Sequence, residues 1–179
     1  MLPLLGAYPE ALPYAEKGLQ AKQTAFGIDS PATAHAHSIL GSALRGSNQL
    51  ERALATDRRA YQLQLSSAGA DDPGTIVDQA TVAEDLLLLG RSNEALPVAR
   101  GALDRVAEVT AVHDAAFVRV IAALVLAQFP EAMEEAQSLA ASALQAPDHS
   151  LPDRLVEPAR EVIAGERPTP VVPSPAGPG

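Results

Sequence analysis

The chain repeats itself at an interval of 42 residues, and this period limits the folds open to it more than any other feature. The step Ala-Leu recurs at this spacing as Ala11-Leu12, Ala53-Leu54 and Ala95-Leu96. A second block matches at the same offset, with Gly27, Asp29, Pro31 and Thr33 falling on Gly69, Asp71, Pro73 and Thr75. A shifted copy follows, where Tyr8-Pro9-Glu10-Ala11 returns as Phe129-Pro130-Glu131-Ala132. Units this short cannot bury an apolar face alone, so the period predicts units that stack on their neighbours.

Each unit contains the signals of two helices joined by a short turn. Ser30-Pro31 and Asp72-Pro73 combine an N-cap oxygen with a proline at the first helical position, where the missing N–H costs nothing. Asn48 and Gly90 supply the residues that end the helices begun there. The apolar periodicity predicts helices over 8–26, 31–46, 49–68, 73–89, 93–109, 112–127 and 130–145, with a shorter one over 152–164 in which Pro158 limits regularity.

The composition agrees with an all-α chain. There are 35 Ala and 23 Leu, which favour helices, but only three Phe, three Tyr and no Trp. We therefore expect an α-solenoid of stacked antiparallel helix pairs. The apolar segment 115–127 is expected to be buried between neighbouring helices. The absence of cysteine excludes disulfides, thiol catalysis and cysteine-ligated zinc, and favours a cytoplasmic location.

Charge and hydropathy exclude two classes of partner. The net charge of −9 repels a phosphate backbone, so we expect no nucleic-acid binding. The apolar segment 115–127 carries Arg119 and is shorter than the roughly 20 residues that a membrane-spanning helix needs, so we expect no membrane association. Pro3 and Glu10 also interrupt any secretory signal at the start of the chain.

Three regions are predicted along the chain. Residues 1–146 hold the repeats, of which the first is truncated, and residues 147–166 hold a C-terminal capping helix. Residues 167–179 contain five prolines and little to bury, which predicts a disordered tail.

The repeats resemble the tetratricopeptide family, in the long variety similar to the kinesin light chain repeats. The family pattern is matched by Leu40-Gly41 in a first helix, Ala53 at the start of a second, and Ala60-Tyr61 further along it. The segments 27–31 and 69–73 resemble the Gly-x-Asp-His-Pro linker of the long variety, with serine or aspartate in place of histidine.

The resemblance implies a protein-binding solenoid whose first helices line a concave groove, with no catalysis and no cofactor. The groove-lining residues that we expect are Ser38, Ser42, Arg45, Thr81 and Glu84. Ser38-Ile39 and Ala80-Thr81 stand where the kinesin-type repeats have a pair of asparagines. Arg45 is the groove residue that we expect to bind an anion. The implied partner is a protein or peptide.

Other residues that could indicate a ligand site have simpler interpretations. His35 and His37 point about 200° apart on a helix and cannot share a metal ion, so we predict no metal site. The arginines at 45, 52, 58 and 59 are expected to form a solvated face, with an acidic partner as the alternative. Glu131, Glu134 and Glu135 suit the first turn of a helix. The phosphate-loop, zinc-protease and serine-hydrolase motifs are absent, so we expect no enzyme.

The start of the chain looks like half of a repeat. Residues 1–7 resemble the last turn of a first helix, so the helix over 8–26 is expected to have an uncovered apolar face. One explanation is that the sequence is the C-terminal part of a longer bacterial signalling protein, a Ser/Thr kinase or transcription regulator with similar repeats. The other is self-association of two copies through the truncated repeat.

Overall fold

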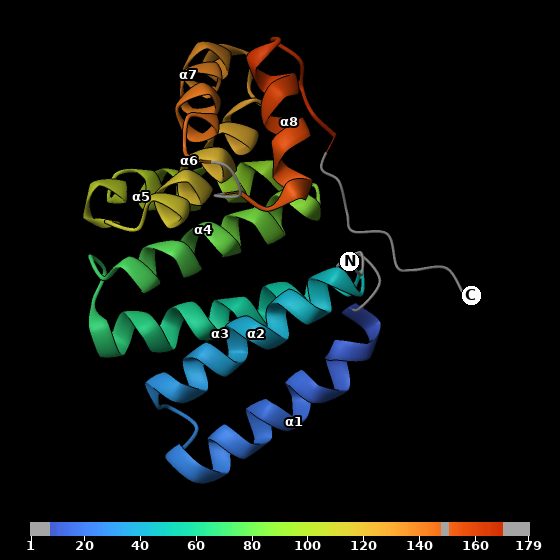
Figure 1. Ribbon diagram of the computed structural model, residues 1–179, viewed down its shortest axis with the longest axis vertical. Helices are drawn as coiled ribbons and strands as arrows, with labels where there is room; N and C mark the ends of the chain where they lie inside the picture. The colour runs from blue at the N-terminus through green and yellow to red at the C-terminus, as the bar shows by residue number, and fades with distance from the viewer. Residues whose placement is uncertain (1–7, 148–150, 170–179) are drawn as a thin grey trace. The chain divides into compact units, whose positions relative to one another are not determined.

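The computed structural model describes residues 8–147 and 151–169, and side chains from residue 11 onward. Within these ranges the chain forms helices and no strand, which confirms the all-α class (Figure 1). The helices are α1 (Tyr8–Phe26), α2 (Pro31–Gly46), α3 (Leu50–Ala68), α4 (Pro73–Leu88), α5 (Ser92–Leu103), η1 (Val106–Glu108), α6 (Val112–Leu126), η2 (Pro130–Ala132), α7 (Met133–Leu144) and α8 (Asp153–Ile163).

The repeated capping signals produce the same local geometry in both copies. The Ser30 hydroxyl accepts the backbone N–H of Thr33 at 3.2 Å, and the Asp72 carboxylate accepts that of Thr75 at 3.0 Å. Both threonines are fully buried beneath the turn. At the other end, Asn48 and Gly90 have φ angles of 58° and 72°, which is the left-handed conformation that ends a helix. Local chemistry therefore sets the bounds of α2 and α4.

Two helices differ from the prediction at one end. The segment predicted as one helix over 93–109 leaves the α-helical form after Leu103, and the short 3₁₀ helix η1 follows. The segment 130–145 begins with a 3₁₀ turn, and α7 starts at Met133. Neither η1 nor η2 has a side-chain cap, and tighter i to i+3 hydrogen bonds satisfy the backbone where caps are missing.

The described residues form two compact units, one of residues 8–69 and one of residues 70–147 with 151–169. In the first unit, α1 packs on α2 and α2 on α3. Its core is built from Ala15 of α1, Leu40, Ala43 and Leu44 of α2, and Ala53 of α3. Small residues at the contacts let these helices approach closely.

The second unit is built around α6. This helix contacts α4, α5, α7 and α8. Its residues are buried almost throughout, which confirms the expectation for segment 115–127. Because neighbours cover it on nearly every side, an apolar sequence here is a packing requirement. No helix in the described part of the chain has the length and hydropathy needed to cross a bilayer.

The segment predicted as a cap forms α8, which packs on α7 and α6. Its buried residues are Leu155, Pro158, Ala159 and Val162. The helix runs from Asp153 to Ile163 without a break at Pro158. Pro168, in the predicted tail, is also buried, and its carbonyl accepts a hydrogen bond from the Gln128 side chain at 3.3 Å. The rest of that tail, 170–179, lies outside the described residues, as do residues 1–7.

Candidate partner-binding surfaces

The structure buries Arg45, which was expected to face a groove and bind an anion. Its guanidinium donates to the Asp57 carboxylate of α3 at 2.6 Å, and the two side chains are 7% and 2% exposed. Gly41, one turn earlier in α2, leaves the space for this carboxylate. A Cβ atom on Gly41 would lie 1.9 Å from Oδ1 of Asp57. Because a buried charge needs a partner, Arg45 serves the α2–α3 contact.

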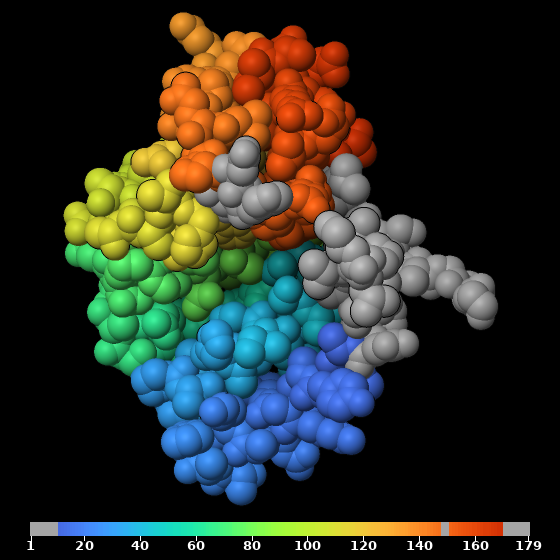
Figure 2. Space-filling model, in the orientation of Figure 1, coloured from blue at the N-terminus to red at the C-terminus, as the bar shows by residue number. Residues whose placement is uncertain are grey.

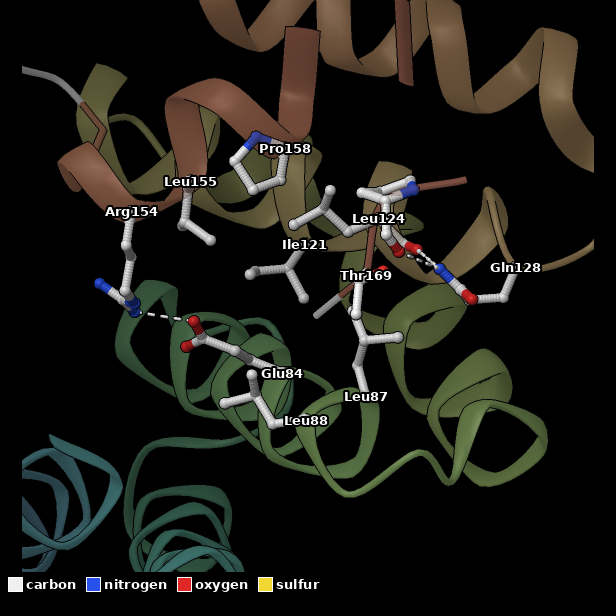
Figure 3. Close-up of a pocket in the computed structure, with 11 residues that line it drawn as sticks. Glu84, Leu87, Leu88, Ile121, Leu124, Gln128, Arg154, Leu155, Pro158 and Thr169 are labelled. Carbon is white, nitrogen blue, oxygen red and sulfur yellow. Dashed lines mark hydrogen bonds and ion pairs between the residues drawn. The ribbon is translucent and has the colours of Figure 1, made fainter. Parts of the chain in front are cut away.

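Glu84 is also buried and paired, in the second unit. Arg154 of α8 donates to its carboxylate at 2.7 Å (Figure 3). Beside this pair lies a cavity of about 30 Å³, lined mainly by apolar side chains of α4, α6 and α8 such as Leu87, Ile121 and Leu155. The last helix therefore covers the part of α4 that carries Glu84.

Thr81 lines an open depression, which we call the α4–α6 hollow. It has a volume of about 450 Å³ and is lined by Val77, Thr81, His113, Asp114, Phe117, Leu151 and Pro152. The Thr81 hydroxyl donates to the Val77 carbonyl at 3.0 Å, and His113 Nε2 lies 3.0 Å from the Asp114 carboxylate. The hollow thus combines hydrogen-bonding groups with an aromatic ring.

Ser38 and Ser42 lie on α2 in the first unit. Ser38 is half-buried, and its hydroxyl lies 3.4 Å from the Ala34 carbonyl to which it donates. Ser42 is exposed and lines a groove between α1 and α2. The five predicted residues are therefore divided, with Ser38, Ser42 and Arg45 in one unit and Thr81 and Glu84 in the other.

This α1–α2 groove is larger than the α4–α6 hollow, at about 620 Å³. Its lining residues are Ala11, Tyr14, Ala15, Gly18, Leu19 and Lys22 of α1 with Ala32, His35, Ala36, Ile39, Ser42 and Ala43 of α2. Figure 2 shows α1, in blue, exposed at the surface of its unit. The sequence predicted an uncovered face on 8–26 but did not identify α2 as the second wall of a groove.

The two neighbouring histidines of α2 have different environments. His35 is exposed, whereas His37 is half-buried. Burial, and to a lesser extent the positive charge of Arg59, lowers the pKa of His37 below its usual 6.5. The described residues contain no group of three or more histidine, aspartate or glutamate side chains placed to hold a metal ion.

Arg52 and Arg59 of the predicted basic face make ion pairs at the surface. Arg52 lies 3.2 Å from Glu16, and Arg59 pairs with Asp29, while Arg58 is exposed. In the second unit, Glu135 of the acidic segment pairs with Arg100 of α5 at 2.7 Å, and this hydrogen bond raises the pKa of Arg100. Exposed pairs of this kind contribute little to stability.

This architecture is similar to that of known repeat proteins. Residues 4–66 match the family model described as tetratricopeptide repeat. A crystal structure of nearly identical TPR-like repeats, from a Podosopora anserina protein described as a kinesin light chain, is similar with a TM-score of 0.55. The match covers 88% of this chain and 87% of that one at 15% sequence identity, which shows a shared fold. None of the curated proteins matches the sequence.

Proposed function

We propose that this chain is a tetratricopeptide repeat protein and that it is a non-catalytic scaffold, which binds a segment of a partner protein on the first helices of its helix pairs. Tetratricopeptide repeats generally mediate protein–protein interaction. Cytoplasmic partners suit a chain that has no cysteine.

The observation that carries this proposal is the α4–α6 hollow. It is open, it lies on α4, which is the first helix of its pair, and it offers both polar and apolar groups. An extended peptide needs both, because its backbone requires hydrogen-bonding partners and its side chains require apolar contacts. Thr81, His113 and Asp114 supply the polar groups, while Val77 and Phe117 supply the apolar surface.

The five predicted groove residues take two roles in this proposal. Ser38, Ser42 and Thr81 are accessible enough to contact a partner directly. Arg45 and Glu84 act as positioning residues, because their ion pairs with Asp57 and Arg154 hold the helices that display the others.

Affinity capture with a blocked hollow tests the proposal. In Thr81→Arg, a long charged side chain enters the α4–α6 hollow, whereas Ser138→Arg places the same side chain on an exposed position of α7. We expect the unaltered chain and Ser138→Arg to capture the same partner protein from the source cells. Thr81→Arg should capture at least about tenfold less of it, which corresponds to about 1.4 kcal/mol of binding free energy. Equal capture by all three proteins would show that the α4–α6 hollow does not bind the partner.

The alternative proposal is a regulatory or assembly region of a longer bacterial signalling protein, such as a Ser/Thr kinase or transcription regulator. The open α1–α2 groove favours it, because stacked repeats cover such faces with one another. The reading frame around the coding sequence tests it. A kinase or DNA-binding motif in the same frame supports the alternative, and a stop codon directly upstream contradicts it.

A further inference from the structure

We propose that the α1–α2 groove is the docking site for an acidic, amphipathic helix of a partner protein. This inference rests on the proposed function, since it takes the chain as a protein-binding scaffold. It concerns a different surface from the α4–α6 hollow, and the two can fail independently.

In the other repeats, a helix fills the position that corresponds to this groove. By the 42-residue period, Ala11 and Gly18 of α1 correspond to Ala53 and Ala60 of α3 and to Ala95 and Ala102 of α5. The four residues of α3 and α5 are at most 1% exposed, whereas Ala11 and Gly18 are exposed. Within their own units, α2 packs on α3 and α4 packs on α5.

The contact in the second unit shows what kind of occupant fits. Ala102 of α5 belongs to a core cluster with Ile76 and Ala80 of α4, and Val118 of α6 joins it. Helix α4 therefore lies against both α5 and α6. The pair α1 and α2 corresponds to α5 and α6 in chain order, and the groove between α1 and α2 is lined, among the described residues, by these two helices alone.

The groove has the dimensions and surface of a helix-binding site. Its wall on α1 runs from Ala11 to Lys22, which is about 17 Å at 1.5 Å per residue, or three helical turns. A Cβ atom on Gly18 would meet no atom within 4 Å, so the floor of the groove is open. Tyr14 and Ile39 are 76% and 51% exposed, and an apolar helix face laid between them would cover both.

Charge selects an acidic occupant. Among the residues that line the groove there is no carboxylate, and its ionisable groups are Tyr14, Lys22 and His35. Lys22 lies at the rim, with its ammonium 5.1 Å from the centre of the exposed Phe26 ring. Residues 1–69 carry five acidic and six basic side chains, whereas residues 70–171 carry seventeen acidic and seven basic ones. The second unit has a strong negative net charge, which repels an acidic helix. The first unit lacks such a negative charge.

The same charges disfavour a second copy as the occupant. In a twofold dimer formed through this groove, each copy presents the same surface, so Lys22 is present twice and neither groove supplies a carboxylate to pair with it. A head-to-tail contact between the groove of one copy and α8 of another is also disfavoured. Asp153, Glu157 and Arg160 of α8 are exposed, and their charged groups would lose hydration in that contact.

A synthetic peptide with the sequence of α4, residues 73–88, is a suitable probe. It carries the apolar face that lies against α5 and α6 in the second unit, and it has three acidic residues, Asp78, Glu84 and Asp85. Binding of the labelled peptide to the full chain is measured by fluorescence anisotropy. We expect saturable binding that weakens with added salt.

Matched variants locate the binding. Gly18→Leu places a side chain on the open floor, where its Cβ atom meets no atom within 4 Å, and it is expected to weaken peptide binding at least about tenfold. Gln62→Leu places the same side chain on an exposed position of α3 and should leave binding unchanged. Lys22→Gln should weaken it by about three- to tenfold. A peptide with the three acidic residues replaced by Asn or Gln should bind the unaltered protein and the Lys22→Gln variant equally.

Several results would overturn the inference. One is the absence of saturable binding at peptide concentrations up to about 1 mM. Another is equal binding to Gly18→Leu, which would mean that the peptide displaces the chain's own α4. A third is a dimer, detected by sedimentation, that Gly18→Leu dissociates. Thr81→Arg should not change peptide binding, so loss of partner capture by that variant and loss of peptide binding by Gly18→Leu report on separate surfaces.

Discussion

The carboxylate of Asp57 occupies the space where a side chain on Gly41 would begin. A Cβ atom there would lie 1.9 Å from Oδ1 and 2.3 Å from Cγ of Asp57. The same carboxylate holds the buried guanidinium of Arg45. The glycine of α2 therefore does more than permit close packing, because it lets a buried ion pair form between α2 and α3.

Gly41→Ala is expected to destabilise the protein by about 3 kcal/mol, because the methyl group displaces Asp57 and weakens its pairing with Arg45. Chemical denaturation followed by circular dichroism measures the change. Gly18→Ala is the matched control, since its methyl group meets no atom within 4 Å. That variant should gain about 0.5–1 kcal/mol from helix propensity, and an equal loss in both variants would contradict the role of the Asp57 contact.

Removal of one partner of the Arg45–Asp57 pair should cost more than removal of both. Arg45→Met removes this charged partner of the buried Asp57 carboxylate, and the expected loss is about 3–5 kcal/mol. Arg45→Met with Asp57→Leu removes both charges and should recover a large part of that loss. A double-mutant cycle of unfolding free energies measures the coupling. Additive effects of the two substitutions would show that the pair is not coupled.

The lowered pKa of His37 predicts that the first unit loses stability in acid. Burial disfavours the protonated form, so the unfolded chain binds more protons than the folded chain once the pH falls through 6.5. The contribution of His37 is therefore fully present above that pH and declines below it. Unfolding free energies measured between pH 7.5 and about 5 should fall less steeply in His37→Gln.

His35→Gln is the control for this pH dependence, because His35 lies on the same helix with an exposed side chain. Its unfolding free energy should follow that of the unaltered protein across the whole range. The same slope in His37→Gln and in the unaltered protein would assign the pH dependence to other groups.

Arg154 is expected to anchor α8. Arg154→Ala leaves the buried Glu84 carboxylate without this partner, and we expect a loss of about 2 kcal/mol together with faster amide exchange over Asp153–Ile163. Arg160→Ala removes a pair with Glu157 on the same helix, but both side chains are exposed, so its cost should be below about 0.5 kcal/mol. Unchanged exchange in Arg154→Ala would contradict the anchoring role.

Features that depend on near neighbours could be predicted from the sequence. Ser30 and Asp72 begin helices through their own side chains, and the spacing of small and apolar residues marks the helix pairs. The all-α class, the repeat and most helix bounds follow from these local preferences. The exceptions, at η1 and η2, occur where no side chain caps the helix.

The environment of each polar group was decided by tertiary structure. Arg45 and Glu84 occupy helix positions that suit a groove, yet their partners lie 12 and 70 residues away in the sequence. Local periodicity carries no information about such distant contacts. The α1–α2 groove is a further case, because its openness depends on which helices pack together. Sequence by itself determined the repeating helix pairs, since caps and periodicity act over a few residues. Only the packing of distant helices decided which charges are buried and which apolar faces stay exposed.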